Sequence, residues 1–191
     1  MSFIVTGLTD LQKRYAATAR AMKSAEARAV RRVGTSIATA QSRGIAQVEN
    51  LRISTIKDAI KIVKQPTPDQ PRVVFEVRGK GIPLGDFIGS RVTSKGLSVQ
   101  PLKGGARAIL KAGFAPLKYG GAFFGRAGTS GKGYGNPHVG RTPIVKLYGP
   151  NVLSQYIKAE IQKLGADTWN TRLPIELERE SNFALKQAGL I

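Results

Sequence analysis

An apolar stripe near the start of the chain limits its possible folds more than any other feature. Nine apolar or small residues recur at intervals of three or four, which is the period of one helix face. They are Leu11, Tyr15, Ala19, Met22, Ala25, Ala29, Val33, Ile37 and Ala40. Thr9 or Asp10 can cap the start, so the pattern predicts one long helix over residues 9–48. Because the stripe is rich in small residues, a sheet or a second helix can approach it closely.

The middle of the chain has a sequence pattern typical of strands and turns, after one short helix. A short helix is predicted over residues 54–64, capped by Ser54 and ended by three prolines between positions 66 and 71. Residues 72–150 form a glycine-rich β region with 17 of the 22 glycines. Runs of β-branched and aromatic residues there predict a small, mostly antiparallel sheet of four or five strands. Residues 120–141 are expected to be a long mobile loop at the tip of a hairpin.

The end of the chain is helical again, over residues 151–190. Asn151 can cap the first helix, and Pro174 predicts a kink before the helix ends near Ala188. The predicted fold class is therefore α+β, in a single domain of residues 1–191. In this fold a long N-terminal helix packs on a small, mostly antiparallel sheet with long glycine-rich loops, and a C-terminal helix follows.

The charge of the chain indicates an acidic partner. The formal net charge is +18, and no acidic residue occurs between Asp86 and Glu160. Such a chain is expected to meet nucleic acid or an acidic protein surface. The candidate contacts with an acidic partner or DNA are Lys95, Lys103, Arg107, Lys111, Arg126, Lys132 and Arg141. On the long helix, Arg28, Arg31 and Arg32 lie near small stripe residues, so they belong either to a solvated face or to a subunit or ring interface.

Aromatic residues in the glycine-rich region allow two interpretations. Phe123, Phe124 and Tyr134 interleave with Arg126 and other basic residues. This mixture can stack bases and hold phosphates. It can also be a hairpin whose aromatic side chains pack against a neighbouring subunit. We favour the second interpretation, which makes the three aromatic residues candidates for a subunit or ring interface.

No pattern of catalytic residues emerges. The chain has no cysteine and a single histidine, His138, which excludes disulfides, thiolate catalysis and two-histidine metal motifs. Residues 125–133 suggest a phosphate-binding loop, but Arg126 stands where its first glycine belongs, and Gly133 replaces the required Ser or Thr. We therefore expect that the protein is not an enzyme and that it binds no cofactor and no metal. We expect no secretory signal, because the first ten residues lack a basic region and a long apolar region, and no apolar run reaches the roughly 20 residues that cross a bilayer.

Five short segments, taken in their order and spacing, resemble one protein family. They are Gly7-Leu8 with Leu11, residues 29–33 (AVRRV), residues 82–84 (IPL) with Phe87, residues 141–150 (RTPIVKLYGP), and Arg172-Leu173 with Glu176-Leu177. The fourth segment is the most specific. Together they resemble the minor tail protein Z family of tailed bacteriophages, the tail completion proteins. The glycine-rich insert at residues 128–135 departs from the family pattern.

The resemblance implies a structural protein made in the bacterial cytoplasm and built into the virion neck. It implies a ring, typically of six copies, that completes the tail at its head-proximal end and helps join tail to head. The implied partners are copies of the chain itself, tail terminator or tail tube proteins, head–tail connector or neck proteins, and genomic DNA in the channel, with no membrane. The alternative is a free basic nucleic-acid-binding protein without catalytic activity, which the charge supports although no recognised binding motif is present.

Overall fold

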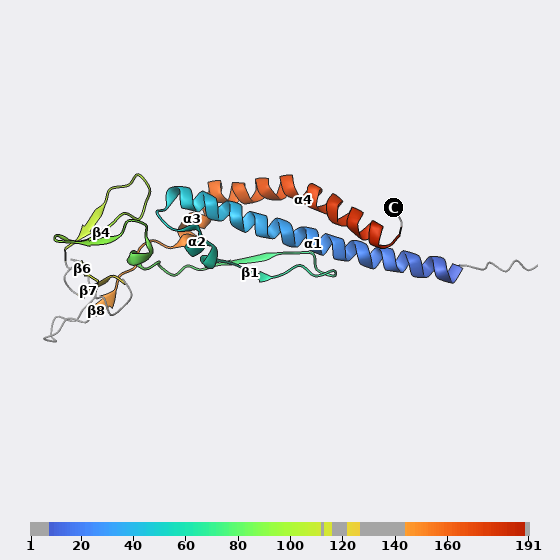
Figure 1. Cartoon of the computed structure of the whole chain (residues 1–191), viewed down its shortest axis with the longest axis horizontal. Helices are drawn as coiled ribbons and strands as arrows, with labels where there is room; N and C mark the ends of the chain where they lie inside the picture. Colours follow the sequence, from blue (N-terminus) through green and yellow to red (C-terminus); the bar gives the residue numbers. More distant parts are fainter. Residues whose placement is uncertain (1–7, 112, 116–121, 127–143, 190–191) are drawn as a thin grey trace, which may run out of the picture. The chain divides into compact units, whose positions relative to one another are not determined.

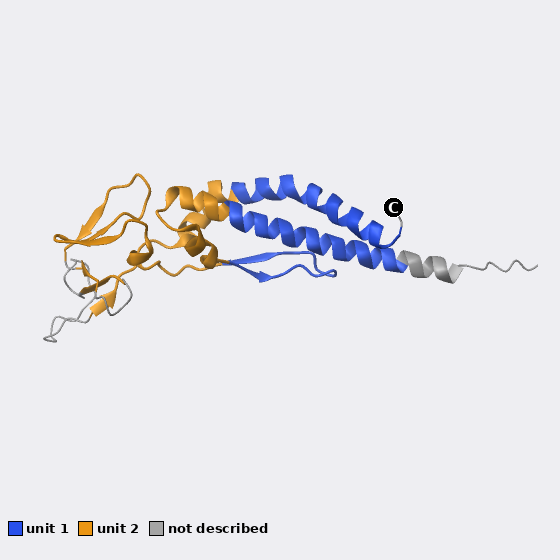
Figure 2. Cartoon of the chain, viewed as in Figure 1, with its two compact units in different colours: residues 1–40, 61–76, 163–191 blue, residues 41–60, 77–162 orange. Residues whose placement is uncertain are grey.

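The computed structural model describes residues 8–111, 113–115, 122–126 and 144–189 of the chain, with backbone alone for residues 8–15 and 126. Contacts between Cα atoms divide the chain into two compact units (Figure 2). Unit 1 comprises residues 1–40, 61–76 and 163–191, and unit 2 comprises residues 41–60 and 77–162. Each unit combines segments that are distant in sequence, and the sequence pattern does not indicate this grouping.

The predicted long helix is confirmed as α1, which spans Leu8–Val48. Ala25, Ala29, Val33 and Ile37 of the stripe are buried, but Met22 is 37% exposed. Ala27 and Val30, outside the stripe, are buried as well. The helix is therefore covered over more than the one face that its sequence pattern marks.

In unit 1, α1 packs on the C-terminal helix α4, which spans Ala159–Gln187 and enters the unit at residue 163 (Figure 1). A two-stranded sheet of β1 (Ile60–Lys64) and β2 (Val74–Val77) completes the unit. A Cβ atom added at Gly34 of α1 would lie 3.0 Å from a methyl group of Val73, so the glycine allows the chain before β2 to lie close to the helix. Helix α4 continues through Pro174 and ends close to the predicted position.

The prediction of a helix over residues 54–64 is wrong in its second half. Helix α2 covers only Ile53–Ala59, and strand β1 follows directly. The run of Ile60, Ile62 and Val63 is β-branched, which disfavours helix and favours a strand once β2 is available as a partner. The predicted cap is wrong too, since Arg52 occupies the N-cap position and makes no side-chain capping bond.

The described residues of unit 2 form two three-stranded antiparallel sheets. One pairs β3 (Arg91–Thr93), β4 (Gly96–Val99) and β5 (Ala108–Leu110) in that order. The other pairs β6 (Gly113–Phe114), β7 (Phe124–Arg126) and β8 (Ile144–Lys146). The prediction of one sheet of four or five strands is therefore wrong, because the described strands form three small sheets.

The two sheets of unit 2 meet through side-chain packing. The side chain of Leu97 in β4 lies over Gly113 in β6, where its Cγ atom would be 2.7 Å from an added Cβ. Leu97 is fully buried by this contact and its surroundings. Because β3 and β5 already pair with both edges of β4, β6 contacts β4 through this side chain and belongs to a different sheet.

Helical turns close unit 2. A short 3-10 helix, η1, spans Leu84–Asp86, and α3 spans Val152–Tyr156. The backbone N–H of Ser154 donates to the side chain of Asn151 over 2.8 Å, which confirms the predicted cap. The core of unit 2 is apolar and includes the fully or nearly fully buried Ile45, Leu51, Ile56, Phe87, Leu97, Val99 and Val152. The α+β fold class is confirmed, with a long N-terminal helix packed on a C-terminal helix and small antiparallel sheets.

Candidate binding sites for an anionic partner

Four of the predicted basic contacts surround one small sheet of unit 2. Lys95 lies in the turn between β3 and β4, Lys103 and Arg107 lie in the loop between β4 and β5, and Lys111 follows β5. All four side chains are exposed. The structure therefore brings together residues that the sequence spreads over 17 positions. Of the other predicted contacts, Arg126 is described by its backbone alone, and Lys132 and Arg141 lie outside the described residues.

Arg107 differs from the lysines because its guanidinium group already has partners. It donates to the carbonyl oxygen of Gly89 over 2.9 Å and to the hydroxyl of Ser98 over 3.1 Å. These bonds connect the loop after β4 to the segment before β3 and to β4 itself. The side chain therefore stabilises the sheet, and the lysines remain the freer cations around it.

The predicted aromatic interface residues pack within unit 2. Phe123 is 4% exposed, which leaves almost none of its side chain for a neighbouring subunit. The ring of Phe124 stacks on that of Phe114 in the adjacent strand, with 6.3 Å between ring centres. Tyr134, like His138, lies outside the described residues. The structure therefore gives Phe123 and Phe124 a packing role inside the chain.

A small cleft in unit 2 combines cations with an exposed aromatic ring. Its volume is about 270 Å³, and its charged lining is Asp58, Arg78, Lys80, Asp86 and Lys146. The Nζ atoms of Lys80 and Lys146 each lie 5.8 Å from the ring centre of Tyr148, within the range of a cation–π contact. The two carboxylates offset most of the positive charge, so an anion has little net attraction to this cleft.

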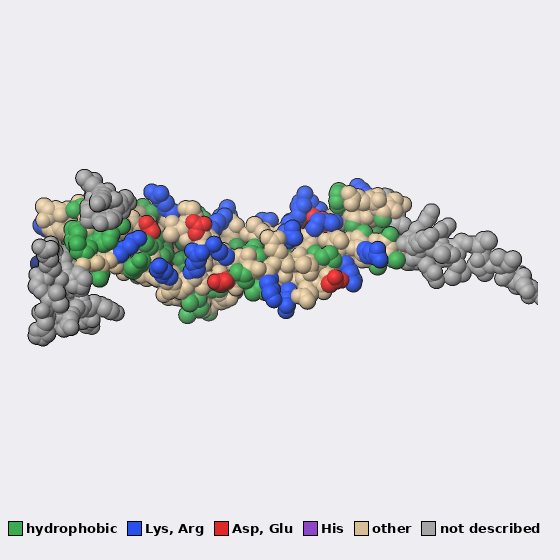
Figure 3. Space-filling view, turned by 90° about the horizontal axis from the view of Figure 1, so that it is seen from below, with side chains coloured by type: hydrophobic (Ala, Val, Ile, Leu, Met, Phe, Trp, Pro, Cys, Tyr) green, Lys and Arg blue, Asp and Glu red, His purple; other side chains and the backbone are tan. Residues whose placement is uncertain are grey.

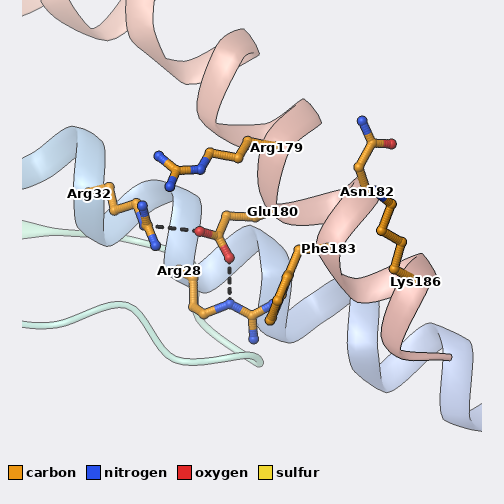
Figure 4. A pocket seen from close by; sticks show the side chains of 7 residues that line it. All are labelled: Arg28, Arg32, Arg179, Glu180, Asn182, Phe183 and Lys186. Atoms are coloured by element: carbon orange, nitrogen blue, oxygen red, sulfur yellow. Dashed lines mark hydrogen bonds and ion pairs between the residues drawn. The ribbon is translucent and has the colours of Figure 1, made fainter.

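A larger cleft in unit 1 carries a much stronger positive charge. It has a volume of about 500 Å³ and lies between α1 and α4 (Figure 4). Its lining consists of Arg28, Arg32, Arg179, Glu180, Asn182, Phe183 and Lys186. Four cations thus surround one carboxylate. Two of the predicted interface residues, Arg28 and Arg32, line this cleft, whereas Arg31 is exposed on α1.

The carboxylate of Glu180 holds the two arginines of α1 in place. Its oxygens accept from Nε of Arg28 over 2.7 Å and lie 2.9 Å from Nε of Arg32. The side chain of Glu180 is only 5% exposed, whereas the two arginines are 40% and 47% exposed. Sequence reasoning missed Glu180, Arg179, Phe183 and Lys186, since a separation of about 150 residues leaves no local signal that they face Arg28.

Unit 2 contains a buried carboxyl group at the end of α1. Glu49 is fully buried, and this burial raises its pKa above the usual value of 4.5. The nearby Gln155 amide and the charge of Lys158 lower the pKa in part, but neither carboxylate oxygen has a hydrogen-bond partner among the described residues. The group is therefore sensitive to pH without lining either of the clefts described above.

In the part of the chain that the structure describes, no three His, Asp or Glu residues are grouped so that they could hold a metal ion. No helix in the same residues is long and apolar enough to cross a membrane. Comparisons with protein-family models, curated proteins and solved structures found no match for this chain.

Proposed function

We propose that this chain is a structural virion protein that completes a phage tail at its head-proximal end and helps join the tail to the head. The observation that carries the proposal is the exposed, apolar edge strand β8. It lies in the segment 141–150, which contributes most to the resemblance to tail completion proteins. In this role the chain binds and supports its neighbours and catalyses no reaction.

Strand β8 has the properties of a surface that a neighbour covers. Among the described strands it is the last of its sheet, and all three of its residues are exposed. Ile144 and Val145 are 59% and 39% exposed. Open edges with apolar side chains pair readily with other chains, so proteins that stay monomeric protect them. Val92 and Ile109 of the other three-stranded sheet are also exposed, which enlarges the apolar surface of unit 2.

The surface charge supports contact with acidic partners in the same assembly. Lys and Arg side chains are frequent on the face drawn in Figure 3, whereas Asp and Glu are sparse. In a ring each copy would bring a formal charge of +18, and the copies would repel one another without nearby anions. Genomic DNA in the channel and the acidic faces of tail terminator, tail tube, connector or neck proteins are the partners that would balance this charge.

A comparison of two matched variants tests the role of β8. Ile144→Asp should abolish the ring of the purified protein, because it places a charge in the apolar subunit contact. Ile175→Asp is the control, since Ile175 is an equally exposed isoleucine (61%) on α4. Gel filtration with light scattering at high salt measures the mass, and incorporation into virions measures function. A wild-type monomer that binds nucleic acid tightly would refute the proposal and favour the free nucleic-acid-binding protein.

A further inference from the structure

The cleft between α1 and α4 in unit 1 contains cations that no carboxylate of the described residues neutralises. Arg179 and Lys186 both line it, and neither forms an ion pair with a described residue. Arg28 and Arg32 use their Nε atoms on Glu180. The terminal nitrogens of Arg28 have no hydrogen-bond partner among the described residues, and those of Arg32 have only Glu176, at 3.9 Å. Glu180 therefore fixes the two guanidinium groups and leaves their outer ends for another anion.

The hydrogen-bonding groups of the cleft favour a phosphate ligand over a peptide. Three arginines, one lysine and the amide of Asn182 provide many donors. The acceptors are the Asn182 amide oxygen and the Glu180 carboxylate, which two arginines already engage. A peptide brings as many backbone donors as acceptors, so most of its N–H groups would lack a partner here. A phosphodiester brings acceptors alone, and Arg guanidinium groups match its geometry.

One wall of the cleft is an exposed aromatic ring. Phe183 is 51% exposed, and the guanidinium carbon of Arg28 lies 5.8 Å from its ring centre. Figure 4 shows the ring beside Arg28, with Lys186 on the same helix. An aromatic side chain beside a group of cations is the usual arrangement for single strands, whose bases stack on the ring while their phosphates meet the cations. Paired bases inside a duplex cannot reach a ring between two helices.

We propose that this cleft binds a single nucleic-acid strand, with a phosphate on the guanidinium groups of Arg28, Arg32 and Arg179 and a base stacked on Phe183. The inference does not depend on a role in the virion. The proposed binding also differs from the general attraction of a basic protein to DNA, because it depends on the ring of Phe183 and on the cations of this one cleft.

Fluorescence anisotropy with a labelled oligothymidylate of about 12 nucleotides tests the proposal. The double variant Arg179→Glu/Lys186→Glu reverses two cations of the cleft. The matched control is Lys61→Glu/Lys163→Glu, which makes the same charge change at two exposed lysines of unit 1 outside the cleft. We expect the cleft variant to weaken binding at least tenfold more than the control. Thermal unfolding checks that each variant remains folded.

Substitutions of Phe183 separate stacking from charge. Phe183→Leu keeps an apolar wall without an aromatic ring and should weaken binding of the strand about tenfold, whereas Phe183→Tyr should retain it. Neither change should affect binding of a duplex of the same length. Equal losses in the two charge-reversal variants, or unchanged binding in Phe183→Leu, would overturn the proposal. So would binding of polyglutamate that depends on the cleft residues and exceeds binding of the oligonucleotide, because it would identify the ligand as an acidic peptide.

Discussion

Replacing Ile37 should cost far more stability than replacing Met22, although both residues belong to the same apolar stripe of α1. Ile37 is 7% exposed, so Ile37→Ala leaves a cavity and should lower the free energy of unfolding by about 2–5 kcal/mol. Met22 is 37% exposed, and water can fill the space that its side chain leaves. Met22→Ala should therefore cost about 1 kcal/mol or less.

The single tryptophan of the chain provides a probe of this difference. Trp169 lies on α4 in unit 1, the unit that contains both substituted residues. Urea unfolding followed by Trp169 fluorescence therefore measures the stability of unit 1 directly. Equal losses in the two variants would refute the reasoning, because they would show that the stripe is buried uniformly and that α1 packs differently from this structure.

Three further predictions concern unit 2 and its charges. Gly149→Ala should destabilise the protein by about 1–3 kcal/mol in urea unfolding, because an added Cβ would lie 2.7 Å from the buried ring of Phe87. Burial raises the pKa of Glu49 in the folded protein, so its neutral carboxyl group favours the folded state. This contribution to the free energy of unfolding is fully present below pH 4.5 and is lost as the pH rises through the folded-state pKa. Glu49→Gln cannot ionise, and its stability relative to wild type should increase from pH 4.5 to neutral pH; a constant difference would exclude this linkage. If the β3–β5 sheet contacts duplex DNA, the double variant Lys95→Glu/Lys103→Glu should bind DNA with a weaker dependence on salt. The slope of log K against log salt concentration should become shallower by about 0.9 for each phosphate that the variant no longer neutralises. An unchanged slope in a salt titration would show that these lysines do not bind phosphates.

The sequence predicts the cations of the unit 1 cleft only in part. Arg28 and Arg32 stand out beside the small residues of the stripe, and their positive charge is evident. Their partner Glu180 lies 152 residues from Arg28. In the sequence it is indistinguishable from the other acidic residues of the C-terminal helix, which are expected to be solvated. The position of Phe183 in the cleft is equally invisible, since it depends on how α4 lies against α1. A cleft that two distant helices form has no local sequence signal.

Local patterns by themselves determined the elements whose stability is largely local. The 3.6-residue period determined α1, the side chain of Asn151 determined the start of α3, and runs of apolar, β-branched and aromatic residues indicated most strands, although not β1. Tertiary structure decided the rest. Residues 60–64 became a strand because β2 offers backbone partners, and Met22 is partly exposed because covering elements bury only part of the stripe. The strands divide into separate sheets because β3 and β5 occupy both edges of β4, and β6 meets β4 only where Leu97 packs over Gly113, a contact that periodicity does not encode.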